Sequence, residues 1–374
     1  MRAAIVLALV TVGCSSDPPW EWPEGTPAEQ GMDAATLEGA RTYAFAEGKN
    51  TQGVVVTRGG VLVAEWYAEG RDATSYGASW SVAKSFTSAL VGIAIDEGTI
   101  DGTGVALAEY YPSWAGDARS MITLEHVLQM STGLEWNEDY NINNANDSDV
   151  VKLVFTTESP LEYVVAKPAE VPSNTEFEYS SGNTLLMSGI LAQATGMSAG
   201  EYAQSRIFDK LDITADWWRA KTGETLTYCC LDMSSRDFAR FGLLYLQGGT
   251  WEGEQVIPEA WVAASITPSP RYAGYGYQWW LEGVTDTSLP PDLYAAEGHD
   301  GQFIYVIPSL DLVVVRNGHY DKFDGPAVAD PQLFLRYPSD GLGNGGGGTI
   351  GPDEWDHAAF LRPILDSITA SARL

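Results

Sequence analysis

The stretch SVAKSFTSALVGIAI, residues 81–95, contains one ionisable side chain, Lys84, among small, hydroxylic and apolar residues. Its apolar residues recur at steps of three and four, which predicts a helix that begins near Ser81 and ends by Gly98. A helix that is apolar on most sides is buried. A buried lysine without a partner is costly, so burial lowers its pKa and makes it a candidate base.

Ser81 precedes Lys84 by three residues, and such positions share one face of a helix. A serine hydroxyl becomes an effective nucleophile when a base lies beside it. The positive end of the helix dipole would also stabilise an oxyanion at Ser81. A serine cap followed by a lysine that reaches solvent explains the same residues without chemistry, so this stretch alone leaves both interpretations open.

The composition indicates a large folded core and argues against nucleic acid as a partner. Hydrophobic residues make up 45% of the 374 residues, enough for one large domain or two lobes. Fifty acidic residues against 21 basic ones give a formal net charge of −29. Phosphate binding needs a basic surface, whereas scattered acidic residues are typical of a solvated one.

The N-terminus predicts export. Residues 1–14, MRAAIVLALVTVGC, are too short to span a membrane and resemble a bacterial lipoprotein signal in which Cys14 is lipidated. Thr11 departs from the usual leucine, and an ordinary secretory signal with an incidental cysteine is the alternative. Residues 15–30 then predict a Pro-rich tether. We expect a periplasmic or cell-surface protein whose membrane contact is a lipid on Cys14.

Strand patterns occur at both ends of the chain, with helix patterns between them. This order predicts an α+β fold in residues 31–374, in which N- and C-terminal segments form one antiparallel sheet. Residues from about 100 to 270 form a mostly helical lobe, and the site lies in the cleft between the two parts. The predicted elements are a helix over 34–46, a hairpin about Arg58-Gly59-Gly60, strands near Tyr275 and from Gln302 and Leu312, and a final helix over 353–368.

We expect no metal and no cofactor. Cys229 and Cys230 are adjacent, and neighbouring cysteines bridge only with strain, so buried free thiols are predicted. The four histidines are dispersed, which argues against a zinc site; His126, His319 and His357 are interpreted as structural. The segment from Asn137 lacks the glycine and glutamate of a calcium loop and is interpreted as an acidic loop beside the cleft.

Two further segments could complete a catalytic site. Tyr179 in FEYSSGN lies in a polar turn just before a helix, with Ser181 two residues later. His299 and Gly301 in EGHDGQFIYVIP immediately precede an apolar strand, where a glycine lets the backbone approach a ligand. Taken singly, each segment is better explained by a tyrosine packed by its ring or by a surface histidine.

Together these segments resemble the serine β-lactamase and penicillin-recognising superfamily, specifically its class C-type branch. The superfamily carries Ser-x-x-Lys, then Tyr-x-Asn, then Lys-Thr-Gly, which correspond to residues 81–84, 179–181 and 299–301 here. SWSVAKSFTSALVGIAIDEG with TGLEWNEDY and YGYQWW is most similar to the 6-aminohexanoate-dimer hydrolase group. The resemblance covers nearly everything from about residue 30 onward.

The resemblance implies acyl transfer in two steps. Ser81 attacks a carbonyl, Lys84 and Tyr179 share the proton relay, and water releases the acyl enzyme. The oxyanion hole would consist of the backbone N–H groups of Ser81 and Gln302. The remaining expected substrate-binding residues are His299, Gly301, Ser181, Tyr140 and Trp279.

Departures from the family pattern limit these expectations. Ser181 replaces the usual asparagine, and His299 with Asp300 replaces Lys-Thr. A neutral histidine lacks the charge that a β-lactam carboxylate needs, so β-lactamase activity is less favoured. A literal Lys-Thr-Gly at 221–223 precedes a helix pattern and is set aside.

The leading hypothesis is an exported serine hydrolase that cleaves a small amide or ester. The alternatives within the same fold are a D-alanyl-D-alanine carboxypeptidase or D-aminopeptidase and a β-lactamase. A lipid-tethered binding module that keeps the fold without turnover is the alternative from another class. Such a binder has no need of Ser81, Lys84 and Tyr179 together.

Overall fold

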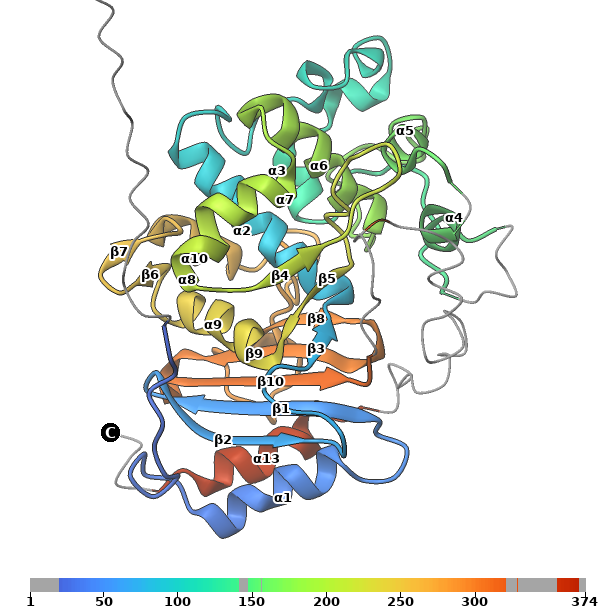
Figure 1. Cartoon of the computed structure of the whole chain (residues 1–374). Helices are drawn as coiled ribbons and strands as arrows, with labels where there is room; N and C mark the ends of the chain where they lie inside the picture. The colour runs from blue at the N-terminus through green and yellow to red at the C-terminus, as the bar shows by residue number, and fades with distance from the viewer. Residues whose placement is uncertain (1–19, 141–146, 156, 321–327, 329–354, 370–374) are drawn as a thin grey trace, which may run out of the picture.

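One five-stranded antiparallel sheet joins the two ends of the chain (Figure 1). The computed structural model describes residues 20–140, 147–155, 157–320, 328 and 355–369. The sheet has the order β2-β1-β10-β9-β8, and Val54 of β1 pairs with Arg316 of β10. Its strands are β1 (Thr51–Arg58), β2 (Val61–Tyr67), β8 (Tyr294–Gly298), β9 (Gln302–Ile307) and β10 (Leu312–Gly318). The structure confirms the predicted hairpin and the two late strands. It also confirms that N- and C-terminal segments form one antiparallel sheet.

Helices cover both faces of this sheet, which explains why β10 is buried throughout. The helices α1 (Ala34–Ala44) and α13 (His357–Ser367) pack together on the lower face in Figure 1. Helix α9 (Ser235–Leu246) lies on the other face. Val313 of β10 belongs to the core above the sheet and Val314 to the core below it. The final helix therefore forms as expected, even with Pro363 inside it.

The middle of the chain forms a lobe built around α2 (Ala83–Asp96). Every residue of α2 from Ala83 to Ala94 is buried, as its apolar pattern predicts. The lobe also contains a small sheet of order β3-β5-β4 and a two-stranded ribbon. The other helices are α3 (Leu124–Leu128), α4 (Asp149–Phe155), α5 (Pro160–Val165), α6 (Ser181–Thr195), α7 (Ala199–Ala203), α8 (Asp209–Leu211), α10 (Glu259–Ser265) and α11 (Glu282–Thr285). The short strands are β3 (Tyr76–Ala78), β4 (Ala215–Trp217), β5 (Leu231–Ser234), β6 (Thr250–Trp251) and β7 (Glu254–Gln255).

The strand predicted near Tyr275 is wrong. Residues 275–280 form a tight turn in which Tyr275 and Trp280 make a single bridge, and Gln278 has a positive φ of 64°. A Cβ on Gly276 would lie 2.1 Å from the carbonyl oxygen of Ser265, so this turn packs directly against backbone. The edge strand of the sheet is instead β8, whose sequence YAAEG carries little strand propensity.

The prediction of free thiols at Cys229 and Cys230 is also wrong, because the two form a disulfide. Cys230 has a positive φ of 64°, and both residues are buried. The disulfide joins neighbours and therefore links no distant elements.

The predicted signal with Cys14, and the first residues of the predicted tether, lie outside the described residues. From Trp20 onward the chain packs on the domain: Trp22 is buried, and Glu24 makes a bridge with Leu62. Among the described residues, the structure contains no helix with both the length and the apolar character to cross a membrane.

Candidate active site

Ser81 lies in a 3-10 turn, Trp80–Val82, that leads directly into α2. Trp80 has a positive φ of 44°, which is uncommon and strained for a residue with a side chain. Ser81 is half-buried, whereas the residues on either side of it are buried. The turn therefore presents one hydroxyl at the start of a buried helix.

Lys84 donates hydrogen bonds to three oxygen atoms, one of which is the Ser81 hydroxyl. Its Nζ lies 2.9 Å from Ser81 Oγ, 3.1 Å from Ser181 Oγ and 3.0 Å from the Tyr228 carbonyl oxygen. Its exposed fraction is 1%. Burial lowers the pKa of Lys84 from its ordinary value of 10.5 to about 8, although the charge of Glu138 acts in the opposite direction.

Glu138 holds the other side of Ser181. The Ser181 hydroxyl donates to Glu138 Oε1 at 2.5 Å, and the Ser181 backbone N–H donates to Oε2 at 2.9 Å. Ser181 is the first residue of α6, where the helix dipole favours a carboxylate. The Trp136 indole and the Tyr140 hydroxyl also donate to Glu138. The carboxylate thus fixes the segment around Tyr140 against α6.

The partners of Lys84 determine where the lone pair of its neutral form points. The Tyr228 carbonyl oxygen can only accept, so it takes one N–H. Ser181 gives its hydroxyl hydrogen to Glu138, so its oxygen accepts from Lys84 as well. These two bonds use both N–H groups of a neutral amine. The remaining lone pair is left for the hydroxyl hydrogen of Ser81.

Tyr179 completes the group that the sequence predicts. It directly precedes Ser180, which caps α6 through a hydrogen bond from the Asn183 backbone. The Tyr179 ring centre lies 5.0 Å from Lys84 Nζ. Burial, followed by the charge of Glu138, raises the pKa of Tyr179 well above its ordinary value, while a hydrogen bond with Ser81 lowers it. Tyr179 is therefore a neutral phenol near neutral pH.

His299 forms part of the wall of the site. Its ring stacks on Tyr140 with ring centres 4.9 Å apart and meets Trp80 edge-on at 5.8 Å. Burial lowers the pKa of His299 to about 4, so the ring is uncharged near neutral pH.

Gly301 is required for a reason that differs from the predicted one. A Cβ at this position would lie 2.6 Å from Nη1 of Arg316. The guanidinium is fully buried and donates to the backbone carbonyls of Asp300 and Gly301 at 2.6 and 2.7 Å. The close backbone approach therefore accommodates an internal arginine and not a ligand.

The edge strand β8 packs directly against the Ser81 turn. A Cβ on Gly298 would lie 2.3 Å from the carbonyl oxygen of Ser79 and 3.1 Å from the backbone nitrogen of Ser81. Gln302 pairs with Gly298 across the sheet, and its side-chain oxygen accepts from Asn317 and from the Gly318 backbone. The Gln302 side chain is thus committed to the sheet.

The prediction that Trp279 lines the site is wrong, and its neighbour Trp280 lies there instead. Trp279 is 0% exposed and packs in the core against Phe241, Tyr245 and Tyr294, so it does not line the site. Trp280 stacks on Tyr179 with ring centres 5.5 Å apart. Neighbouring side chains of extended backbone point to opposite faces, so only one of the two tryptophans can face Tyr179. The sequence did not indicate which one.

Sequence reasoning missed two partners of the reacting groups. Glu138 lies within TGLEWNEDY, a segment that carried the resemblance, but Glu138 itself had no assigned role. An acidic residue two positions before a candidate pocket tyrosine was the available signal. No sequence signal indicates the Tyr228 carbonyl, because every residue type has a backbone carbonyl group.

Known proteins are similar to this chain over most of its length. The family described as "Beta-lactamase" matches residues 44–333. The chain is 27% identical to the 6-aminohexanoate-dimer hydrolase of Paenarthrobacter ureafaciens over 299 residues, which are 71% of this chain and 72% of that protein.

Solved structures share the fold. A penicillin-binding protein homologue from Caulobacter crescentus has a TM-score of 0.59 at 16% identity, covering 80% of this chain and 94% of that chain. A D-stereospecific amidohydrolase from Streptomyces has a TM-score of 0.56 at 15% identity, covering 79% and 95% of the two chains. The predicted α+β fold is confirmed.

Proposed function

Because the chain belongs to the beta-lactamase family of serine hydrolases, we propose that it is an exported enzyme that cleaves a small amide or ester bond through an acyl-serine intermediate. The observation that carries the catalytic part is the 2.9 Å separation of Lys84 Nζ and Ser81 Oγ inside a buried helix. An amine with a lowered pKa beside a serine is the arrangement that nucleophilic catalysis needs. Export rests on the N-terminal sequence alone.

In the proposed acylation, Lys84 acts as the base. Its neutral Nζ takes the hydroxyl proton of Ser81 while Ser81 Oγ forms a bond to the substrate carbonyl carbon. Tyr179 stays protonated near neutral pH, so its phenol donates a proton to the leaving nitrogen or oxygen as the scissile bond breaks. The ammonium of Lys84 then returns a proton to Tyr179, and both groups regain their starting states.

Deacylation repeats these transfers with water. A water molecule loses a proton to Lys84 as its oxygen attacks the acyl carbon, and Ser81 Oγ leaves with the proton that Tyr179 donates. The ammonium of Lys84 then returns a proton to Tyr179. The backbone N–H of Ser81 is one proposed donor to the oxyanion. Because Gly298 lies against the Ser81 backbone, we favour the residue that follows it, His299, over Gln302 as the second donor.

The charges around the site support a restricted class of substrate. The charge of Glu138 raises the pKa of Tyr179, which means that negative potential reaches the phenol. A substrate carboxylate close to the scissile bond would be repelled, as would the carboxylate of a β-lactam. We therefore propose a linear amide or ester whose acyl part is neutral or cationic near the carbonyl. A relative named 6-aminohexanoate-dimer hydrolase is consistent with this class.

Fluorophosphonate labelling tests the enzyme class. Wild-type protein should form an adduct on Ser81, and S81A should form none. S88A is the matched control, because the Ser88 hydroxyl is buried in the same helix without a hydrogen-bond partner among the described residues. Absence of an adduct in folded wild-type protein would leave the non-catalytic binding module as the better explanation.

A substrate panel then tests the substrate class. The panel contains p-nitrophenyl esters, aminohexanoate oligomers, D-alanyl peptides and a chromogenic cephalosporin. We expect turnover of the esters and the linear amides. Preferential turnover of D-alanyl peptides or of the cephalosporin would contradict the proposed class and favour a D-peptidase or a β-lactamase.

A further inference from the structure

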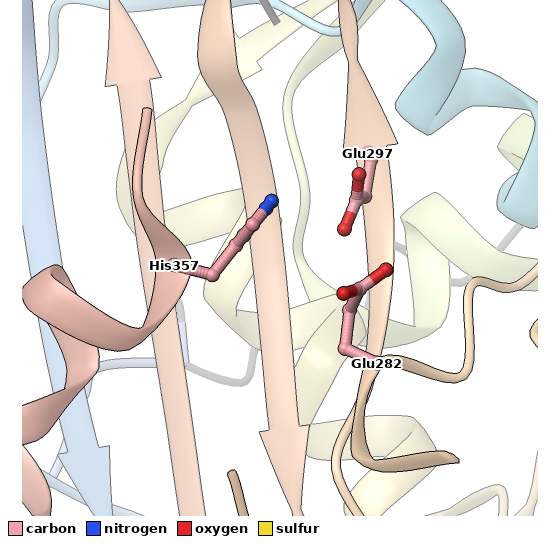
Figure 2. A group of neighbouring side chains, drawn as sticks. All are labelled: Glu282, Glu297 and His357. Atoms are coloured by element: carbon pink, nitrogen blue, oxygen red, sulfur yellow. The ribbon is translucent and has the colours of Figure 1, made fainter. Parts of the chain in front are cut away.

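Three titratable residues from distant segments meet at the edge of the large sheet, and none of them belongs to the proposed proton relay. Glu282 begins α11, Glu297 lies in β8 and His357 begins α13. One candidate ligand atom from each residue lies within 4.8 Å of the others. Figure 2 shows the imidazole of His357 directed toward the two carboxylates. We call these residues the carboxylate–histidine cluster.

The carboxylate of Glu297 has a buried oxygen, Oε1, that makes no hydrogen bond with any described group. Burial, followed by the charge of Glu282, raises the pKa of Glu297 well above its ordinary value. Two close, partly buried carboxylates favour a shared proton or a cation between them.

His357 has the form and orientation of a metal ligand. Burial lowers the pKa of His357 to about 4, so its imidazole is neutral near neutral pH. Its Nδ1 lies 2.8 Å from the Tyr305 hydroxyl, which also accepts a hydrogen bond from Trp355. A hydroxyl oxygen has two lone pairs, so Tyr305 can accept from both neighbours and leave Nε2 of His357 free to bind.

We propose that the carboxylate–histidine cluster binds one first-row transition-metal dication, with Zn²⁺ as the natural probe. One imidazole nitrogen and two carboxylate oxygens suit Zn²⁺, whereas Ca²⁺ and Mg²⁺ favour sites made wholly of oxygen. Two ligand atoms of a tetrahedral zinc ion are about 3.3 Å apart, so the side chains need to close by up to about 1.5 Å. A fourth position would be left for water.

A metal here would join three elements near the nucleophile. It would tie the start of α13 to β8, and Gly298 follows Glu297 in that strand and packs against the Ser81 turn. The proposed role is therefore to brace one wall of the site. This departs from our expectation of no metal, because ligands that lie so far apart in the chain show no recognisable spacing.

Zinc titration of the metal-free full chain tests the proposal. Isothermal titration calorimetry at pH 7.5 should show one Zn²⁺ per chain, and saturating Zn²⁺ should raise the melting temperature by a few degrees. E297Q and H357Q should each weaken binding at least tenfold and remove the thermal shift. E282Q provides a second carboxylate variant in case E297Q folds poorly. E259Q, at an exposed position of α10, should bind like the wild type.

Two results would overturn the proposal. One is the absence of saturable binding at one ion per chain in the wild type. The other is binding that survives unchanged in E297Q, E282Q and H357Q, which would place the ion elsewhere. If the wild type binds no zinc and E297Q melts higher in zinc-free buffer, the two carboxylates share a proton instead.

Discussion

Replacing Lys84 with methionine should change how the stability of the protein depends on pH. Lys84 is 1% exposed, and burial lowers its pKa from 10.5 to about 8. A shift of one pKa unit corresponds to about 1.4 kcal/mol, so folding destabilises the protonated amine by about 3 kcal/mol. Methionine fills a similar volume and carries no proton.

The direction of this pH dependence follows from the number of protons that the folded and the unfolded chain bind. Below pH 8 both the folded and the unfolded chain hold the proton on Lys84. The folded wild type is then destabilised by the full ~3 kcal/mol of burying the protonated amine. Between pH 8 and 10.5 the unfolded chain binds more protons, so the free energy of unfolding rises with pH. The K84M variant lacks this increase. The stability of K84M minus that of the wild type should therefore fall by about 3 kcal/mol between pH 7 and 10.5.

Urea unfolding of both proteins at a series of pH values measures this difference. Other titrating groups are common to both proteins and cancel in the comparison. K221M, at an exposed lysine of the lobe, is the matched control and should follow the wild type. In parallel, kcat/KM of the wild type on a p-nitrophenyl ester should rise with pH through about 8, and K84M should be inactive. A stability difference that stays constant within about 1 kcal/mol would refute the lowered pKa of Lys84.

Three further substitutions test the neighbouring groups. S81A should abolish ester hydrolysis and keep the melting temperature, whereas S88A should keep both; an active S81A protein would exclude this residue as the nucleophile. G298A forces a Cβ into the backbone beside the nucleophile and should reduce kcat/KM at least a hundredfold, which kinetics would show. G104A, at a glycine with open space around it, is its control. E138Q removes the acceptor of two N–H donors and should lower kcat roughly tenfold or more; unchanged kcat would mean that the carboxylate does not hold the relay.

The features that sequence reasoning predicted well depend on local pattern. The helix after Ser81 is apolar on nearly every side, so its burial and the proximity of Lys84 follow from helical geometry alone. The hairpin at Arg58-Gly59-Gly60 rests on turn chemistry, and β10 rests on a run of apolar residues. Tyr179 was found only by adding the family resemblance to its place before a helix.

The features that were missed depend on tertiary contacts. Strand β8 forms because its backbone pairs with β9, although its own residues have weak strand propensity. Trp279 and Trp280 are identical in type, and only packing decides which one meets Tyr179. The contacts of Glu138 with Ser181 join segments that no spacing rule connects.

The pairing of Val54 with Arg316 has a consequence for the newborn chain. Strand β1 leaves the ribosome roughly 260 residues before its partner β10, which lies on the inner side of the sheet. Contacts between such distant positions form slowly, because the closing loop is long. The sheet, and with it the edge strand beside residue 81, therefore assembles only after β10 has been made. Until then the nascent protein stays without a working centre.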